Sequence, residues 1–326
     1  MLFGGLRAKG MVKTMNKIKN CSFAKEFVKN KALFLMLLPG TLLLIMFSYL
    51  PMGGVTIAFK QINYGLGIWK RPWVGLSNFK FLFSTEDWFI ITRNTLLYNV
   101  SWLFAGLFLA VAIAIGLSQI KQKRMCKFYQ SVMILPYFLS WVIISYVVLA
   151  FLNTEHGMMN TSVMPMLGKK PVSWYTETKP WPFILTIVNL WKYAGYNSVV
   201  YLAAIVGIDK TLYEAAAIDG ATRWQQIRHI TIPSITSLMI IMSIMAVGKI
   251  FNADFGLFYQ VPLQSGALYP VTNVIDTYVY TMLKSAGNSS VGMSAATGLY
   301  QSLCAFILVI VTNLIVRRID EDSALF

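Results

Sequence analysis

Two stretches of the chain carry polar side chains that could bind a solute, although their surroundings are apolar. The first is "NLWKYAGYNS", residues 189–198, and the second is "VGKIFNADFGLFY", residues 247–259. Amides and hydroxyls form hydrogen bonds, aromatic rings offer flat apolar faces, and lysine supplies positive charge. Such groups are costly within a membrane unless they face a cavity or a partner. The candidates for lining a solute path are Asn189, Lys192, Tyr193, Tyr196, Asn197, Lys249, Asn252 and Asp254.

The two lysines in these stretches leave alternatives open. Lys192 could meet an acidic solute, pair with a carboxylate, or extend to the membrane surface. Lys249 could join Lys192 in a positively charged cavity, or form a structural ion pair with Asp254. We favour the ion pair.

Catalytic and metal-binding patterns are missing from the sequence. Its histidines are His156 and His229, and it has no His-Glu-x-x-His, Gly-x-Ser-x-Gly or Gly-x-x-x-x-Gly-Lys-Ser/Thr motif. Its three cysteines form no Cys-x-x-Cys pair. We therefore predict no catalytic residue, no metal site and no nucleotide site in this chain, so it is not an enzyme by itself.

The composition predicts an integral membrane protein. Of 326 residues, 56% are hydrophobic and 13% are charged, about half the charged fraction of a soluble domain. A membrane helix needs about 20 apolar residues. Six runs qualify, at residues 32–50, 95–117, 131–152, 183–206, 235–251 and 296–316. The fold class is therefore all-α, with six transmembrane helices.

The charge distribution predicts the orientation. The formal net charge is +15, and lysine and arginine gather before the first run and between the second and third. Because cytoplasmic loops are enriched in these residues, both termini are expected in the cytoplasm, and nucleic-acid binding is not expected. The predicted parts are a basic cytoplasmic segment, 1–31, a transmembrane domain, 32–316, and a cytoplasmic tail, 317–326. An amphipathic helix at residues 269–283 is expected on the outer face.

A polar segment, "LYEAAAIDGATRWQQIRHITIP", separates the fourth and fifth runs inside the predicted cytoplasmic loop 207–234. It reads as helix, turn, helix. Thr211 is the expected N-cap of the first helix, with Glu214 as its capping-box partner. Gly220 can end that helix in a left-handed conformation. Pro233 marks the entry into the fifth span.

This segment resembles the signature loop of permease subunits of ABC importers. The family pattern is Glu-Ala-Ala, three residues, Gly, nine residues, Ile, one residue, Leu, Pro. The matching positions here are Glu214, Ala215, Ala216, Gly220, Ile230, Ile232 and Pro233, with Ile232 in place of Leu. Asp219 also matches the common Asp-Gly-Ala, while "PWVGLSNFKFLF" is similar to a segment of the carbohydrate branch. The "VIDTYVY" run and the long last outer loop resemble those of permeases for alginate and pectin oligosaccharides.

The resemblance implies a type I importer permease in a bacterial inner membrane. It implies a second homologous permease, two ATPase subunits that use ATP and Mg, and an extracytoplasmic solute-binding protein, with lipid around the spans. The residues expected at the ATPase contact are Glu214, Ala215, Ala216, Asp219, Gly220 and Arg223. No cofactor is expected on this chain, and the substrate is expected to be an oligosaccharide.

Two other functions fit a polytopic membrane protein. A secondary transporter or channel would work without an ATPase, but it would be expected to have carboxylates within its spans, and none is clear. A membrane scaffold or receptor would transport nothing.

Overall fold

The computed structural model describes residues 29–61, 72–285 and 290–319. The regular secondary structure of these residues is helical, and they contain no strand, only one isolated β-bridge between Lys60 and Trp73. The chain divides into two units, Met1–Thr56 and Ile57–Phe326, which are described separately. Most of the basic segment 1–31 and of the tail 317–326 lies outside the described residues.

The first unit contains one apolar helical rod. It comprises α3 (Lys31–Leu44), the π-helix η1 (Ile45–Tyr49) and the start of the 3-10 helix η2 (Leu50–Phe59). No side chain of α3 or η1 is buried. An apolar helix with every face exposed suits a lipid environment, and it covers the predicted first span.

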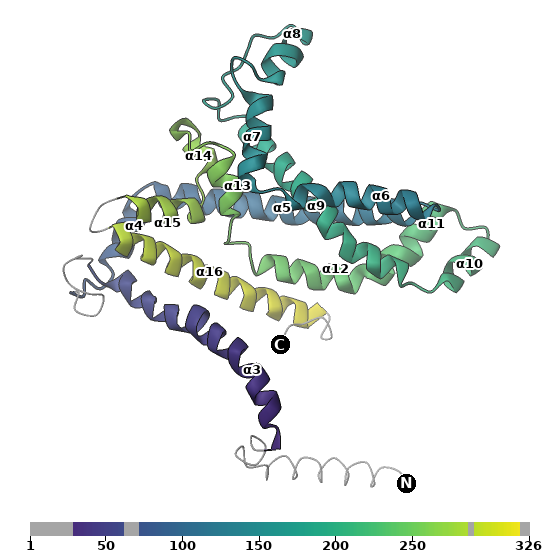
Figure 1. The fold of residues 1–326 in the computed structure, drawn as a ribbon, viewed down its shortest axis with the longest axis horizontal. Coiled ribbons are helices and arrows are strands. Elements are labelled where there is room, and N and C mark those ends of the chain that lie inside the picture. Colours follow the sequence, from purple (N-terminus) through teal and green to yellow (C-terminus); the bar gives the residue numbers. More distant parts are fainter. Residues whose placement is uncertain (1–28, 62–71, 286–289, 320–326) are drawn as a thin grey trace. The chain divides into compact units, whose positions relative to one another are not determined.

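The second unit is built around three long helices. They are α5 (Asp87–Ser118), α9 (Trp181–Val206) and α12 (Ile232–Val247). Helix α5 packs along α9, and α12 contacts both (Figure 1). A fourth long helix, α16 (Ser290–Ile319), packs against α12 and carries α15 (Ile275–Lys284) and α4 (Ser77–Ser84).

Shorter helices connect these four. They are α6 (Lys123–Ile134), η4 (Leu135–Phe138), α7 (Trp141–Leu152), η5 (Met159–Val163), α8 (Met164–Met166), α10 (Lys210–Ile218), α11 (Arg223–Gln226), η6 (Ile227–Thr231), α13 (Phe255–Gln260), η7 (Gly266–Leu268) and α14 (Tyr269–Thr272).

The described helices only partly reproduce the six predicted spans. Four helical stretches are long and apolar enough to cross a membrane: 31–59, 87–118, 223–247 and 290–318. The bent pair α6–η4 and α7 adds a fifth if it forms one span. Helix α9 has the length, at 26 residues, but the polar residues between 189 and 198 lower its hydropathy.

The third predicted span is broken. Helices α6–η4 and α7 meet at 98° across residues 139–140. Pro136 lies in η4, and the Ser140 side chain caps α7 by accepting a hydrogen bond from the Ile143 N–H at 3.3 Å. The break therefore has a local cause, since proline ends one helix and a serine cap begins the next.

Each of the three π-helical turns among the described residues ends two residues before a proline. Turn η1 precedes Pro51, η5 precedes Pro165 and η6 precedes Pro233. Proline lacks an N–H and its ring crowds the carbonyl one turn earlier, and a wide turn relieves both problems. The fifth span accordingly does not begin at Pro233: the helix starts at Arg223 and passes through this proline.

The amphipathic helix predicted at residues 269–283 is two helices, α14 and α15, which corrects the prediction. The break lies at Asn273 and Val274. The Asn94 amide of α5 donates to the Pro270 and Asn273 carbonyls at 3.2 and 2.9 Å. A side chain distant in sequence therefore satisfies the carbonyls at the end of α14.

One buried amide organises the segment between α7 and α9. Asn160 donates to the carbonyls of Thr154 and Val172 at 3.0 and 2.8 Å. Its oxygen accepts from the Val172 N–H at 3.1 Å and from the Trp174 indole at 3.0 Å. Four polar groups thus depend on one side chain.

We expect Asn160→Ala to destabilise this segment by about 3 kcal/mol, because several buried polar groups lose their partner. Thermal unfolding of the purified protein, with limited proteolysis within residues 153–180, measures the effect. Thr161→Ala at the exposed neighbouring position is the control and should change little. Equal melting temperatures for both variants would contradict the role of Asn160.

Candidate functional site

A polar cavity lies between α5, α9 and the end of α12. Its volume is about 440 Å³, and we call it the asparagine cavity. Its polar lining includes Asn99 from α5, Asn189, Tyr193 and Asn197 from α9, and Lys249, Asn252 and Asp254 from the segment after α12. The sequence predicted six of these seven residues; the exception is Asn99. The two polar stretches therefore do meet at one cavity.

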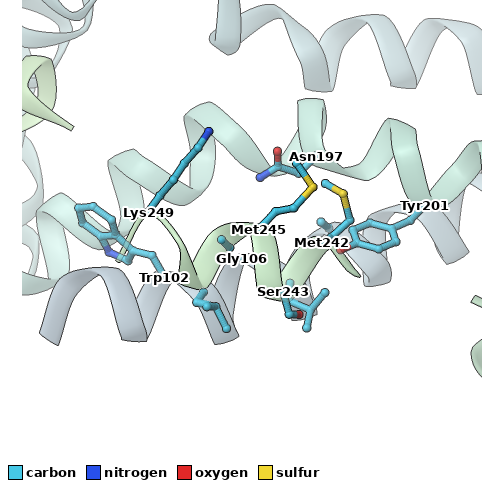
Figure 2. A pocket seen from close by; sticks show the side chains of 12 residues that line it. Trp102, Gly106, Asn197, Tyr201, Met242, Ser243, Met245 and Lys249 are labelled. Atoms are coloured by element: carbon cyan, nitrogen blue, oxygen red, sulfur yellow. The ribbon is translucent and has the colours of Figure 1, made fainter. Parts of the chain in front are cut away.

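A second cavity continues along the same three helices and is mostly apolar. Its volume is about 290 Å³, and we call it the methionine cavity. In Figure 2, Trp102 and Lys249 lie at one end and Tyr201 and Met242 at the other. Because Trp102, Asn197 and Lys249 line both cavities, the two form a continuous groove.

The favoured ion pair between Lys249 and Asp254 is wrong. Asp254 accepts from the Tyr193 hydroxyl at 2.6 Å and caps α13 by accepting from the Gly256 and Leu257 N–H groups. The described structure has no ion pair between Lys249 and Asp254, and the Lys249 side chain is exposed in the groove. The carboxylate is held by neutral donors, and the lysine side chain is exposed in the groove.

Lys192 has a different environment from the one the sequence suggested. It is only 5% exposed and lines neither cavity. Its ammonium donates to the backbone carbonyls of Pro136, Tyr137 and Leu139. None of the three alternatives for this lysine included a backbone partner. Tyr196 stacks on Tyr137 with ring centroids 4.0 Å apart and is likewise absent from the cavity linings.

Sequence reasoning missed several residues that build the groove. Asn99 donates to the Ile250 carbonyl at 2.8 Å, and Gln301 of α16 donates to the Phe251 carbonyl at 2.7 Å. The Asp276 carboxylate accepts from the Ala253 N–H at 2.7 Å. These bonds fix the non-helical segment that carries Lys249. One signal for Asn99 was present in the sequence: it shares a face of α5 with Trp102 and Gly106 at helical spacing.

The loop 207–234, which is predicted to contact the ATPase and is called the coupling segment below, contains an exposed helix, α10 (Lys210–Ile218), with no buried residue. Its N-cap is Asp209, whose carboxylate accepts from the Thr211 N–H at 3.0 Å, which corrects the predicted cap at Thr211. This hydrogen bond lowers the pKa of Asp209 below its ordinary value of 3.8. Any stability from the charged cap is therefore present above pH 3.8 and lost as the pH falls through the lowered pKa.

Gly220 ends α10 in the left-handed conformation, as the sequence predicted, with φ at +80°. The Ala221 N–H bonds to the Ala216 carbonyl at 2.8 Å, and the Gly220 N–H bonds to the Ala217 carbonyl at 3.1 Å. This pair of bonds is a Schellman motif. The Asp-Gly-Ala sequence thus sets the angle at which α10 turns toward α11.

The coupling segment is attached to the rest of its unit at two points. The Tyr213 hydroxyl lies 2.9 Å from the Thr231 hydroxyl of η6. Arg223 donates to the Gln119 side chain, beyond the end of α5, at 2.8 Å. Between these anchors, Glu214 is exposed, Ile218 is 87% exposed and Trp224 is 70% exposed. Apolar side chains this exposed mark a surface suited to contact with another protein.

A groove lined by α5, α9 and the end of α12, together with the exposed helix α10 between α9 and α12, is the arrangement expected of a membrane transporter subunit. A family model described as "Binding-protein-dependent transport system inner membrane component" matches residues 103–321. The chain belongs to this family, and its fold is that of a type I ABC importer permease.

Curated relatives and solved structures agree with this membership. The chain is 33% identical to "Protein LplB" of Bacillus subtilis (strain 168), over 94% of each chain. It is also 33% identical to the "Polygalacturonan/rhamnogalacturonan transport system permease protein YteP" of the same strain, over 91% of each chain. A chain of a bacterial ABC transporter involved in import of the acidic polysaccharide alginate matches with a TM-score of 0.81 and 32% identity, covering 91% of this chain and 98% of that one. A second structure of a bacterial alginate ABC transporter, with a periplasmic protein bound to alginate pentasaccharide, also scores 0.81.

We expect Gly220→Ala to cost about 1 kcal/mol, since a Cβ is strained in the left-handed region. The Ala221 amide, which closes the Schellman motif, should then exchange its hydrogen faster. Gly220→Asn is the matched control, because asparagine tolerates this conformation better, and it should retain more protection. Equal exchange in all three proteins would show that the turn does not require glycine.

Proposed function

We propose that this chain forms half of the translocation path of an ATP-driven, binding-protein-dependent oligosaccharide importer in a bacterial inner membrane. The observation that carries the proposal is the continuity of α9. One part of this helix lines the asparagine cavity, and its end leads through residues 207–209 directly into the exposed helix α10. The proposed solute-binding and energy-coupling surfaces therefore lie on consecutive helices, α9 and α10, joined by a three-residue link.

The proposed topology has six spans, with α9 as the fourth and the broken pair α6–η4 and α7 as the third. Both termini lie in the cytoplasm, as the lysines and arginines of segment 1–31 and the pair Arg317 and Arg318 after the last span favour. Helix α10 is then cytoplasmic, and the segment 153–180 is extracytoplasmic. The transmembrane domain covers residues 32–316.

The partners follow from what the chain itself lacks. Its sequence has no phosphate-binding loop, so two separate ATPase subunits bind ATP and Mg and contact α10. The contact includes Glu214, Ala215, Ala216, Asp219 and Gly220, while Arg223 orients the loop through Gln119. A second, homologous permease covers the open side of the groove, and a solute-binding protein delivers substrate.

The groove suits a carbohydrate. Amides at 189, 197 and 252 supply directional hydrogen bonds, Trp102 supplies an apolar ring, and Lys249 supplies a positive charge. Permeases named for polygalacturonan and alginate import are among the relatives and structural matches. We therefore propose acidic oligosaccharides as the substrate class, with Lys249 contacting a carboxylate.

The coupling contact is tested by affinity purification of the tagged chain, expressed with its neighbouring transport subunits. Glu214→Ala and Gly220→Arg should lower recovery of the ATPase about tenfold, because they alter the centre of a protein contact. Glu177→Ala, at an exposed glutamate in the segment 153–180, is the control and should change nothing. A wild-type chain that purifies without any ATPase would contradict the proposal and favour a secondary transporter.

The substrate contact is tested with Lys249→Met in the reconstituted transporter. The KM for an oligouronate should rise about tenfold through loss of a charge-assisted hydrogen bond. A neutral oligosaccharide of equal length, if it is transported, should be unaffected. Lys249→Arg keeps the charge and should retain most of the affinity. Equal effects of Lys249→Met on charged and neutral sugars would remove the charge-specific role.

A further inference from the structure

Lys192 is a buried cation in the middle of a helix that lines the groove. Its neighbours Asn189 and Tyr193 face the asparagine cavity, but Lys192 points away and is 5% exposed. An ammonium in such a position is costly unless several acceptors surround it. Its acceptors therefore indicate why a lysine stands here.

All three hydrogen-bond acceptors of Lys192 belong to the break in the third predicted span. The ammonium bonds to the Pro136 carbonyl at 3.4 Å, to the Tyr137 carbonyl at 3.1 Å and to the Leu139 carbonyl. Helix ends leave carbonyls without intrahelical partners and carry partial negative charge. One ammonium has three donors, so Lys192 serves all three carbonyls from a single atom.

A second contact fixes the same break one turn further along α9. A Cβ at Gly195 would clash with the Met133 carbonyl oxygen near the end of α6, so the two backbones touch there. The Lys192 ammonium also lies 4.8 Å from the centroid of the Trp141 ring, at the start of α7, within range of a cation–π interaction. Both sides of the break are therefore held against α9.

The contacts of Lys192 and Trp141 form a closed chain of interactions that includes residues of the groove. The Trp141 indole packs directly against Gly256, where a Cβ would clash with a ring carbon. Gly256 donates its N–H to Asp254, and Asp254 accepts from Tyr193, the residue after Lys192. Lys192 thus links the broken span to α9 beside the α12–α13 junction that carries Lys249.

We infer that Lys192 is a positioning residue that makes the broken span move with α9. The inference rests on the proposed function, in which ATPase closure displaces α10 and therefore α9. With the ammonium present, the break follows that displacement and the groove changes shape. Without it, three carbonyls lose their common partner, and α9 moves while α7 lags behind.

Reconstituted transport tests this role in the assembled complex. Lys192→Met keeps the length and apolar stem but removes the donors. We expect import per ATP hydrolysed to fall about tenfold, with ATP hydrolysis retained and the KM for oligosaccharide unchanged. Lys192→Arg restores donors and should recover much of the ratio. Lys249→Met gives a contrasting pattern, because it should raise the KM for the oligosaccharide. An unchanged ratio in Lys192→Met would overturn the inference.

A crosslinking measurement in membranes is independent of transport. The Tyr137 and Tyr196 rings stack 4.0 Å apart across the same junction. Cysteines at these two positions, in a chain without Cys21, Cys126 and Cys304, report whether η4 stays on α9. Lys192→Met should slow their crosslinking by a short bifunctional reagent, and Lys192→Arg should restore it. If Lys192→Met slows crosslinking but the wild-type complex imports no oligosaccharide, the positioning role is supported and the proposed function is contradicted. Crosslinking at the wild-type rate in Lys192→Met would overturn the inference.

Discussion

The second unit depends on one constraint: a peptide group at membrane depth must find a hydrogen-bond partner within the protein. A continuous helix meets this requirement by itself, but the break between α6–η4 and α7 does not. The Lys192 ammonium donates to the carbonyls of Tyr137 and Leu139, and it is a second donor to the Pro136 carbonyl, which also accepts from the Leu139 N–H at 3.2 Å. A sharp bend is thereby tolerated in an apolar segment, and it gives α7 a direction of its own (Figure 1).

The same helix that stabilises the break also lines the groove and leads into the exposed helix α10. Helix α9 presents asparagines and Tyr193 to the groove, small residues such as Gly195 to α6, and its end to the coupling segment. The polar residues that lower its hydropathy are therefore the ones with specific partners. A helix with this many polar contacts gains its stability from protein packing rather than from lipid.

The sequence predicted what depends on local pattern. Apolar runs located most of the membrane-length helices, the Glu-Ala-Ala signature located α10, and the spacing around Gly220 indicated a left-handed turn. Contacts between distant segments were not predictable in the same way. The carbonyls that hold Lys192 lie 53 to 56 residues away, and Gln301 lies 50 residues from Phe251. The cap of α10 was misplaced because Asp209 and Thr211 both have capping side chains, and only the backbone geometry distinguishes them.

The π-helical turn before Pro233 has a consequence for how force reaches the membrane. A wide turn holds one more residue than an α-helical turn, and successive residues of an α-helix are about 100° apart around the axis. Tightening or shifting η6 would therefore rotate α11 about the axis of α12. The coupling segment could then change its azimuth while the span below it kept its depth in the bilayer.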